Sequence, residues 1–269
     1  MRLAAIVILA IVLVASAASS QSYPVLQPVP RTTDPAALHR LANQREILER
    51  IRIGFAASER ADWNAAAAEF ERAIALHPGE PQASTAYYDL GIARAGLREY
   101  AGAAAAFEEA IARDSGFLAA RANLVAVNLL RGNLVAARAA ADAFVAVAPE
   151  SARALYARGL ISLKTGDAPT AVADFAKLSA GEPAYAVAHY DLALAERQLG
   201  RFADAERELR TAIQLAPAYA RAHIALGAVL LYEGKRDEAR SAFDAAADAA
   251  KDVAMHNLAV SLRDAVVRP

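Results

Sequence analysis

Residues 192–217, LALAERQLGRFADAERELRTAIQLAP, decide the fold of this chain. The stretch that follows one period later, residues 226–251, reads LGAVLLYEGKRDEARSAFDAAADAAK and places small and large residues at the same positions. Three more copies begin at Arg158, Leu124 and Leu90, and a first copy begins at Ile53. Self-similarity with a fixed period of about 34 residues predicts an array of stacked supersecondary units.

The repeated units begin near residues 47, 84, 118, 152, 186 and 220. No run of alternating apolar and polar residues is long enough to predict a strand. Roughly a quarter of the residues are Ala, which is the best helix former because its ordering costs no side-chain entropy. We therefore expect an all-α protein.

Each recurring residue type has a packing reason. A small residue after Leu, and an Ala twelve positions later, allow two antiparallel helices to approach closely. Large residues in the second half of a unit should fill the gap between neighbouring units, at about 1.5–3 kcal/mol each when buried. Gly can adopt the left-handed backbone that ends the first helix, and Pro ends the second helix. The residues expected to end the first helices are Gly166, Gly200 and Gly234, and those expected to end the second helices are Pro78, Pro149, Pro183 and Pro217. The large positions are held by Phe70, Phe107, Phe175 and Phe243.

The period, the Leu-Gly pair, the Ala, the Phe and the closing Pro together resemble the tetratricopeptide repeat family over residues 47–251. The resemblance implies a right-handed α-solenoid of helix-turn-helix repeats. We assign residues 34–251 to six such repeats and residues 252–269 to a C-terminal capping helix that covers the last apolar face.

The third and fourth repeats depart from the pattern. Val125 replaces the Gly, Ala141 stands at a large position, and Phe144 fills in one turn later. Arg158 replaces Leu, and Gly181 lies inside the second helix. We expect these two repeats to be the softest part of the array.

The N-terminal residues have the layout of a secretory signal. Met1-Arg2 is positively charged, the segment from Leu3 to Val14 is apolar, and Ala15-Ser16-Ala17 fits a cleavage site. We assign residues 1–17 to a signal peptide, with an uncleaved membrane anchor as the alternative. Residues 18–33 are rich in Pro and form a linker, and Asp34-Pro35 starts a helix, with Asp as the N-cap.

Composition and motifs argue against several classes of function. The net charge of -1 disfavours a nucleic-acid partner, and the chain has no Cys for thiol chemistry. His189 and His223 occupy the same position in successive repeats, but no Asp or Glu completes a metal-ligand set, so we expect packing and no metal. No catalytic or phosphate-binding motif is present, so we expect neither an enzyme nor a cofactor.

The resemblance also implies that the first helices line a concave groove that binds peptides or proteins. The residues expected at this groove are Tyr88, Asp89, Asn123, Arg153, Tyr156, Tyr190, Asp191 and Arg221. Tyr suits an interface because its ring offers apolar area and its hydroxyl a hydrogen bond, but Tyr at this repeat position can equally be structural. The positions of a dedicated carboxylate clamp are not matched.

These observations predict a non-catalytic scaffold or adaptor of the bacterial periplasm or cell envelope that binds a partner protein or peptide. The alternative is an assembly factor anchored in the inner membrane, in which the apolar N-terminal segment is retained and the Pro-rich segment is a spacer. A membrane contact is expected only in that second case.

Overall fold

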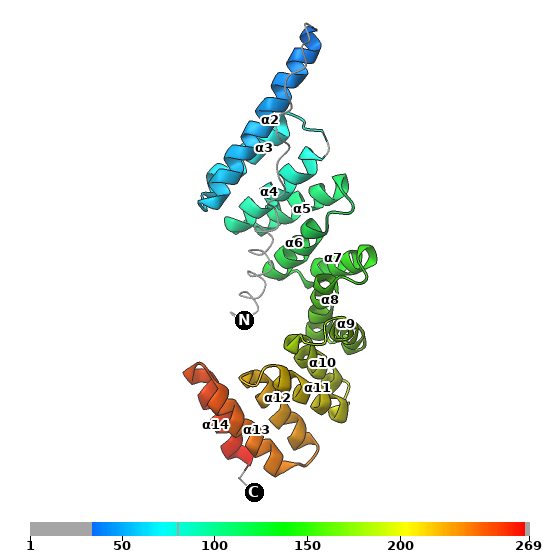
Figure 1. The fold of residues 1–269 in the computed structure, drawn as a ribbon, viewed down its shortest axis with the longest axis vertical. Coiled ribbons are helices and arrows are strands. Elements are labelled where there is room, and N and C mark those ends of the chain that lie inside the picture. Colours follow the sequence, from blue (N-terminus) through cyan, green and yellow to red (C-terminus); the bar gives the residue numbers. More distant parts are fainter. Residues whose placement is uncertain (1–33, 80, 267–269) are drawn as a thin grey trace. The chain divides into compact units, whose positions relative to one another are not determined.

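A computed structural model describes residues 34–79 and 81–266 (Figure 1). The expected signal peptide and most of the expected linker lie outside these residues. Over the described residues all regular structure is helical. The helices are α2 (Pro35–Glu59), α3 (Trp63–Ala75), α4 (Gln82–Gly96), α5 (Tyr100–Arg113), α6 (Leu118–Leu130), α7 (Leu134–Val147), α8 (Ala152–Thr165), α9 (Ala168–Gly181), α10 (Ala186–Gln198), α11 (Phe202–Leu215), α12 (Ala220–Tyr232), α13 (Arg236–Ala249) and α14 (Val253–Val266).

The chain forms two compact units, an N-terminal unit up to Ala148 and a C-terminal unit from Pro149 onward. In the N-terminal unit, helices α2 to α7 each contact the next helix in sequence. In the C-terminal unit, the same holds for α8 to α14. The prediction of an all-α fold built from successive helix-turn-helix repeats is confirmed.

The helix boundaries follow from local sequence. The first helices α6, α8, α10 and α12 begin at the repeat starts read from the sequence, and α4 begins slightly before its repeat start. The first repeat differs, because α2 already begins at Pro35. Its N-cap is Asp34, whose carboxylate accepts hydrogen bonds from the amides of Ala36 and Ala37, as predicted.

The turns inside the repeats use left-handed residues. Gly166, Gly200 and Gly234 have φ angles of 85°, 74° and 77°, which confirms their predicted role at the end of the first helix. The first two repeats make the same turn with Ala61 and Arg98, which also have positive φ.

In four repeats, a Phe of the second helix lies against the Gly of the first helix. A Cβ atom placed on Gly91 would lie 2.5 Å from the ring of Phe107, and one on Gly227 would lie 2.5 Å from the ring of Phe243. Gly54 and Gly159 face Phe70 and Phe175 in the same way. The sequence had assigned these rings to the gap between repeats, whereas the structure shows that they also fill the inside of a repeat.

The third repeat is filled by a different combination of side chains. Val125 on the first helix and Ala141 on the second are both buried, so the larger residue of this pair, Val125, lies on the first helix. The ring of Phe144, one turn after the usual large position, is also fully buried. The departures from the pattern therefore leave the core of this repeat occupied.

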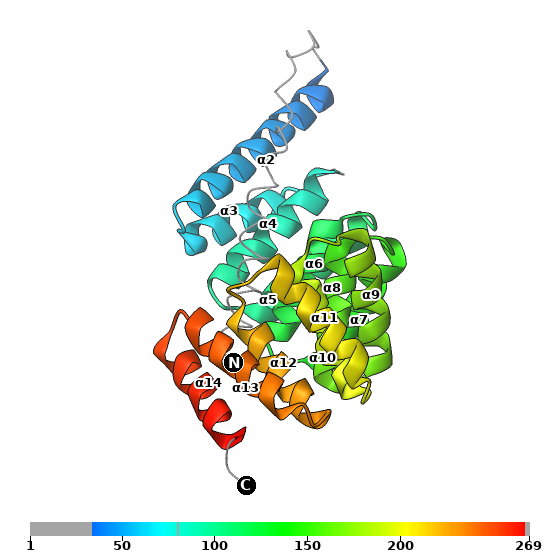
Figure 2. The same ribbon diagram turned by 60° about the horizontal axis from the view of Figure 1, so that its bottom comes forward.

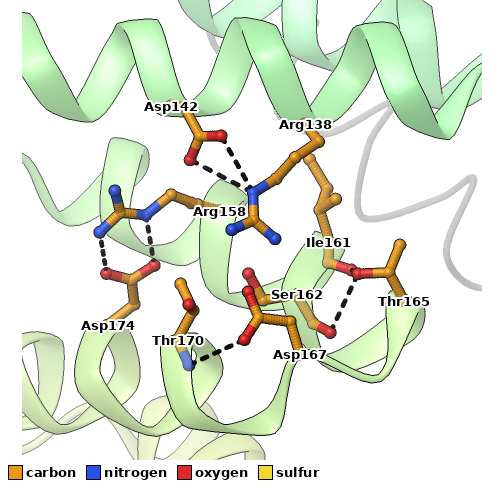
Figure 3. A network of polar contacts seen from close by, with 9 residues as sticks. All are labelled: Arg138, Asp142, Arg158, Ile161, Ser162, Thr165, Asp167, Thr170 and Asp174. Carbon is orange, nitrogen blue, oxygen red and sulfur yellow. Dashed lines mark hydrogen bonds and ion pairs between the residues drawn. The ribbon is translucent and has the colours of Figure 1, made fainter.

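The fourth repeat contains an ion pair in place of an apolar contact (Figure 3). Arg158 on α8 donates through Nε and Nη2 to the two carboxylate oxygens of Asp174 on α9, at 2.8 and 2.6 Å. Asp174 is 2% exposed. This two-pronged geometry suits a guanidinium and a carboxylate and links the two helices of the repeat.

The last helix, α14, packs beside α13 (Figure 2). Ala259 is fully buried, and Leu262 and Val266 pack against the core formed by α10 to α13. The helix therefore caps the array, as predicted. In the part of the chain that the structure describes, no helix combines the length and apolar character needed to cross a membrane.

Candidate partner-binding site

The first helices of the C-terminal unit form one surface, since α10 contacts both α8 and α12. We call this surface the first-helix face. Tyr156 on α8 and Tyr190 on α10 lie on it, and both are half-buried. The ring of Tyr156 lies 6.2 Å from that of Tyr185, and the ring of Tyr190 lies 5.0 Å from that of Tyr219. These four residues, Tyr156, Tyr185, Tyr190 and Tyr219, are the tyrosine cluster.

Asp191 on α10 directly follows Tyr190, and its charge raises the pKa of each tyrosine of the cluster in addition to the larger effect of burial. It is 6% exposed, and its Oδ2 has no hydrogen-bond partner among the described residues. Burial raises the pKa of its carboxyl to about 7, and the Tyr156 hydroxyl and the charge of Arg221 oppose that rise. Burial and then the Asp191 charge raise the pKa of the Tyr156 hydroxyl.

Two arginines adjoin the cluster. Arg153 is exposed in the first turn of α8, on the same helix as Tyr156. Arg221 is half-buried on α12, and its charge lowers the pKa of both Asp191 and Tyr190 against the larger effect of burial. Five of the residues singled out from the sequence thus lie on the first helices of one unit.

The other three residues lie in the N-terminal unit and are buried. Tyr88 is 3% exposed and packs on Phe107 and Phe117, with ring centroids 5.8 and 4.7 Å away. Asn123 is 1% exposed and its Nδ2 donates to the Tyr88 hydroxyl at 3.3 Å. Asp89 is 6% exposed, and burial raises its pKa to about 7. In this structure these three side chains offer a partner little surface.

Sequence reasoning missed Tyr185 and Tyr219. Both precede a first helix directly, at the N-cap positions of α10 and α12. The available signal was that they lie one repeat period apart, with Phe117 at the same repeat position two periods before Tyr185. The aromatic residue at the end of one repeat reaches the Tyr of a first helix, which no single-repeat pattern reveals.

The two histidines of α10 and α12 bind structural partners. His189 Nδ1 lies 2.8 Å from Glu208 Oε2 and its Nε2 lies 3.1 Å from the Pro183 carbonyl oxygen. His223 Nε2 lies 2.9 Å from the Pro217 carbonyl oxygen. Each imidazole therefore ties a first helix to the turn before it. Among residues 34–79 and 81–266, no three His, Asp or Glu side chains are grouped as metal ligands.

Two open grooves occur away from the tyrosine cluster, at equivalent repeat positions in the two units. The larger, of about 570 Å³, lies between α11, α12 and α13, with Ile213, Leu226 and Leu230 in its wall. The smaller, of about 260 Å³, lies between α3, α4 and α5. The charged residues at their rims form ion pairs, Arg210 with Glu238 in the first groove and Arg94 with Glu71 in the second, each at 2.8 Å.

Solved structures share this fold. A tetratricopeptide repeat protein from Parabacteroides merdae is 16% identical with a TM-score of 0.60, and the match covers 82% of this chain and 99% of that one. YrrB, described as a TPR protein with an unusual peptide-binding site, is 18% identical with a TM-score of 0.60, covering 71% and 97%. A MamA protein is 24% identical with a TM-score of 0.59, covering 62% and 92%.

No curated protein sequence matches this chain. A family model described as tetratricopeptide repeat matches residues 52–117, 129–186 and 190–255, which is more than half of the chain. The protein is therefore a member of the tetratricopeptide repeat family.

Proposed function

We propose that this protein is a non-catalytic scaffold that binds a partner protein or an extended peptide on the first-helix face of the C-terminal unit. The observation that carries the proposal is the tyrosine cluster, four half-buried aromatic rings beside Arg153 and Arg221. Tyr and Arg, with Trp, are enriched among the few residues that dominate the binding energy of protein interfaces. Proteins of this family are generally interaction scaffolds, and YrrB is described as having a peptide-binding site.

The chemistry of the face favours a segment that makes both apolar and polar contacts. A Tyr ring buries a large area with few rotatable bonds, so it binds at low entropic cost. Arg153 is exposed and adds a positive charge at the α8 end, which favours an acidic residue there. Changing Arg153 to Glu should therefore weaken such a partner and make its binding less dependent on salt.

The test is a double variant with a matched control. Tyr156→Ala with Tyr190→Ala should reduce affinity for the partner by roughly 1–2 kcal/mol per residue, as for other aromatic anchors. Tyr87→Ala is the control, because Tyr87 is also half-buried and packs on another side chain, the Arg113 guanidinium 4.2 Å from its ring, but lies in the N-terminal unit. Affinity by titration and melting temperature are measured on both variants.

Two results would count against the first-helix face. One is a double variant that binds the partner as tightly as the parent. The other is a melting temperature that falls much further in the double variant than in Tyr87→Ala, because the tyrosines would then be core residues and the loss of binding would reflect unfolding.

We further propose that the protein is exported to the periplasm or cell envelope of a bacterium, on the strength of the signal-like residues 1–17. The mature protein should then begin at Ala18 or within about three residues of it. N-terminal sequencing of the exported protein tests this. A Met1 terminus on membrane-extracted protein would support the alternative, an assembly factor anchored in the inner membrane.

A further inference from the structure

The larger groove of the C-terminal unit, which we call the sixth-repeat groove, lies between α12 and α13 with α11 along one side. His223 on α12 and Ala242 on α13 both line it. The fifth repeat holds His189 and Glu208 at these two positions. The two repeats therefore differ here in one side chain, a carboxylate that the sixth repeat lacks.

The imidazole ring is anchored in the same way in both repeats. In each ring Nε2 binds the carbonyl oxygen of the proline in the preceding turn, at 3.1 Å for His189 and 2.9 Å for His223. A carbonyl oxygen only accepts, so Nε2 donates in both rings. Because the anchor is the same, the two Nδ1 atoms point toward the same position of the second helix. His189 Nδ1 lies 2.8 Å from Glu208 Oε2 there, whereas His223 faces the methyl group of Ala242 and no hydrogen bond joins its Nδ1 to a described residue.

The fourth repeat also places a carboxylate at this position. Asp174 stands where Glu208 does, and it accepts a hydrogen bond from Arg158 Nη2 at 2.6 Å. Two successive repeats thus pair an acidic side chain of the second helix with a basic side chain of the first helix. The sixth repeat keeps the basic side chain, His223, without the acidic one. The sixth-repeat groove is therefore complementary to a carboxylate that comes from another molecule.

The wall of the groove beyond His223 is apolar. Ile213, Leu226 and Leu230 line it. An α-helix rises about 1.5 Å per residue, so Leu230 lies about 10 Å along α12 from His223. Apolar surface of a partner would be removed from water along this wall, next to the position of the carboxylate.

The charged side chains of the groove lie toward the Leu230 end. They are Arg210 from α11 and Asp237 and Glu238 from α13. Arg210 pairs with Glu238 at 2.8 Å. The amide of Lys235, just before α13, donates to the Leu230 carbonyl oxygen at 2.9 Å and so fixes the start of α13 at this end. A carboxylate beside His223 would lie about 7.5 Å along α13 from the level of Asp237, where repulsion in an open groove is weak.

We propose that the sixth-repeat groove binds a Glu side chain of a partner protein, with the carboxylate at His223 Nδ1 and a neighbouring apolar side chain on Leu226. A carboxylate only accepts hydrogen bonds, so Nδ1 donates to it when the ring is protonated. Binding to a neutral ring therefore takes up a proton and strengthens as pH falls through the range in which histidines titrate. This site is separate from the tyrosine cluster and gives the protein a second contact for partners.

The test uses defined peptides, so no natural partner is needed. The probes are acetylated and amidated peptides Leu-X-Leu, in which X is Glu, Gln or Lys. Binding is followed by NMR through backbone amide signals and histidine ring signals. The Glu peptide should move the signals of His223 and Ala242 at about pH 6 and bind about tenfold more tightly than the Gln peptide, which lacks the charge. Raising the pH to about 8 should remove most of this difference.

Variants test the two residues that define the site. Ala242→Glu gives the sixth repeat the carboxylate of the fifth, so it should abolish binding of the Glu peptide and move the His223 ring signals without any peptide. His223→Gln should lower the affinity for the Glu peptide to that for the Gln peptide. His189→Gln is the matched control, because Glu208 already occupies that position, and it should leave the affinity unchanged. Melting temperatures show whether each variant is folded.

The smaller groove of the N-terminal unit is an internal control. It holds Tyr87 and Ala106 at the positions of His223 and Ala242, so it has the small residue without the basic one. The signals of α4 and α5 should therefore not distinguish the Glu peptide from the Gln peptide.

Four outcomes would overturn the proposal. Glu and Gln peptides that bind equally well at about pH 6 would show that no carboxylate is selected. A Lys peptide that binds more tightly than the Glu peptide would show that Asp237 and Glu238 determine the charge preference. A folded Ala242→Glu variant that binds the Glu peptide as the parent does would place the peptide elsewhere, and His223→Gln decides the same point if Ala242→Glu does not fold. If no peptide moves the signals of α12 and α13, the site is refuted, and the Tyr156 and Tyr190 double variant still tests the first-helix face.

Discussion

The core of each repeat depends on a size match between one residue of its first helix and one of its second. Four repeats pair Gly on the first helix with Phe on the second, as in Gly227 and Phe243. The fifth repeat pairs Ala193 with Leu209, and the third pairs Val125 with Ala141. All these side chains are buried. A larger residue on one helix is matched by a smaller one on the other, because the space between the helices is filled at close-packed density.

This match predicts the effect of changing one partner alone. Gly227→Ala should destabilise the protein by about 1–3 kcal/mol, because the new Cβ would lie 2.5 Å from the Phe243 ring. Adding Phe243→Leu should recover much of the loss, since the repeat then has the Ala and Leu of the fifth repeat. Urea unfolding measures both variants.

Gly181→Ala is the control for that experiment. Apart from the backbone of its own helix and its chain neighbours, no atom lies within 4 Å of a Cβ placed on Gly181, so this change should leave stability unchanged or raise it by up to about 1 kcal/mol. A size match would be refuted if Gly227→Ala unfolded at the same urea concentration as the parent.

At the level of the helix pair, α8 and α9 are joined by the Arg158–Asp174 ion pair (Figure 3). The second, third and sixth repeats hold Leu and Ala at these two positions, as in Leu226 and Ala242. Asp174 is almost fully buried, whereas the Arg158 side chain is 24% exposed. The two partners are therefore unequal, because Arg158 can reach water without its partner and Asp174 cannot.

Arg158→Leu should accordingly be more damaging than Asp174→Ala. The first change leaves a buried carboxyl without its guanidinium and should cost about 3 kcal/mol or more. The double variant restores the residues of the other repeats and should be more stable than Arg158→Leu alone. A double-mutant cycle in urea measures the coupling. Additive effects of the two changes would show that the ion pair contributes nothing beyond its separate side chains.

At the scale of the whole molecule, each unit is held together by contacts between helices that follow one another in sequence. Buried carboxyls oppose this stability at high pH in both units. Burial raises the pKa of Asp89 and of Asp191 to about 7, from an ordinary value of 3.8. The folded state therefore holds these protons more tightly than the unfolded state does.

The consequence is a stability that declines as pH rises. The two bound protons contribute fully to the free energy of unfolding below the ordinary Asp pKa of 3.8, and this contribution is lost as pH rises through about 7. Asp89→Asn with Asp191→Asn should therefore be more stable than the parent at about pH 8, by an amount on the order of a few kcal/mol. The advantage should shrink toward about pH 4. Urea unfolding at several pH values checks this, and parallel pH profiles for parent and variant would contradict it.

The sequence by itself determined the all-α repeat fold, the places where four of the first helices begin and three of the glycines that end them. These features depend on short-range patterns, such as Asp34 capping a helix or Gly166 ending one, and the periodic sequence displays such patterns several times. The tertiary structure decided which equivalent residues are exposed. Tyr88 and Tyr156 share a repeat position, yet one is buried and the other half-buried, because side-chain exposure depends on the residues that neighbouring repeats bring to it. The pairing of Tyr185 with Tyr156, and of Tyr219 with Tyr190, was likewise decided by the tertiary structure, since the two members of each pair lie at opposite ends of a repeat and meet only when the helices pack.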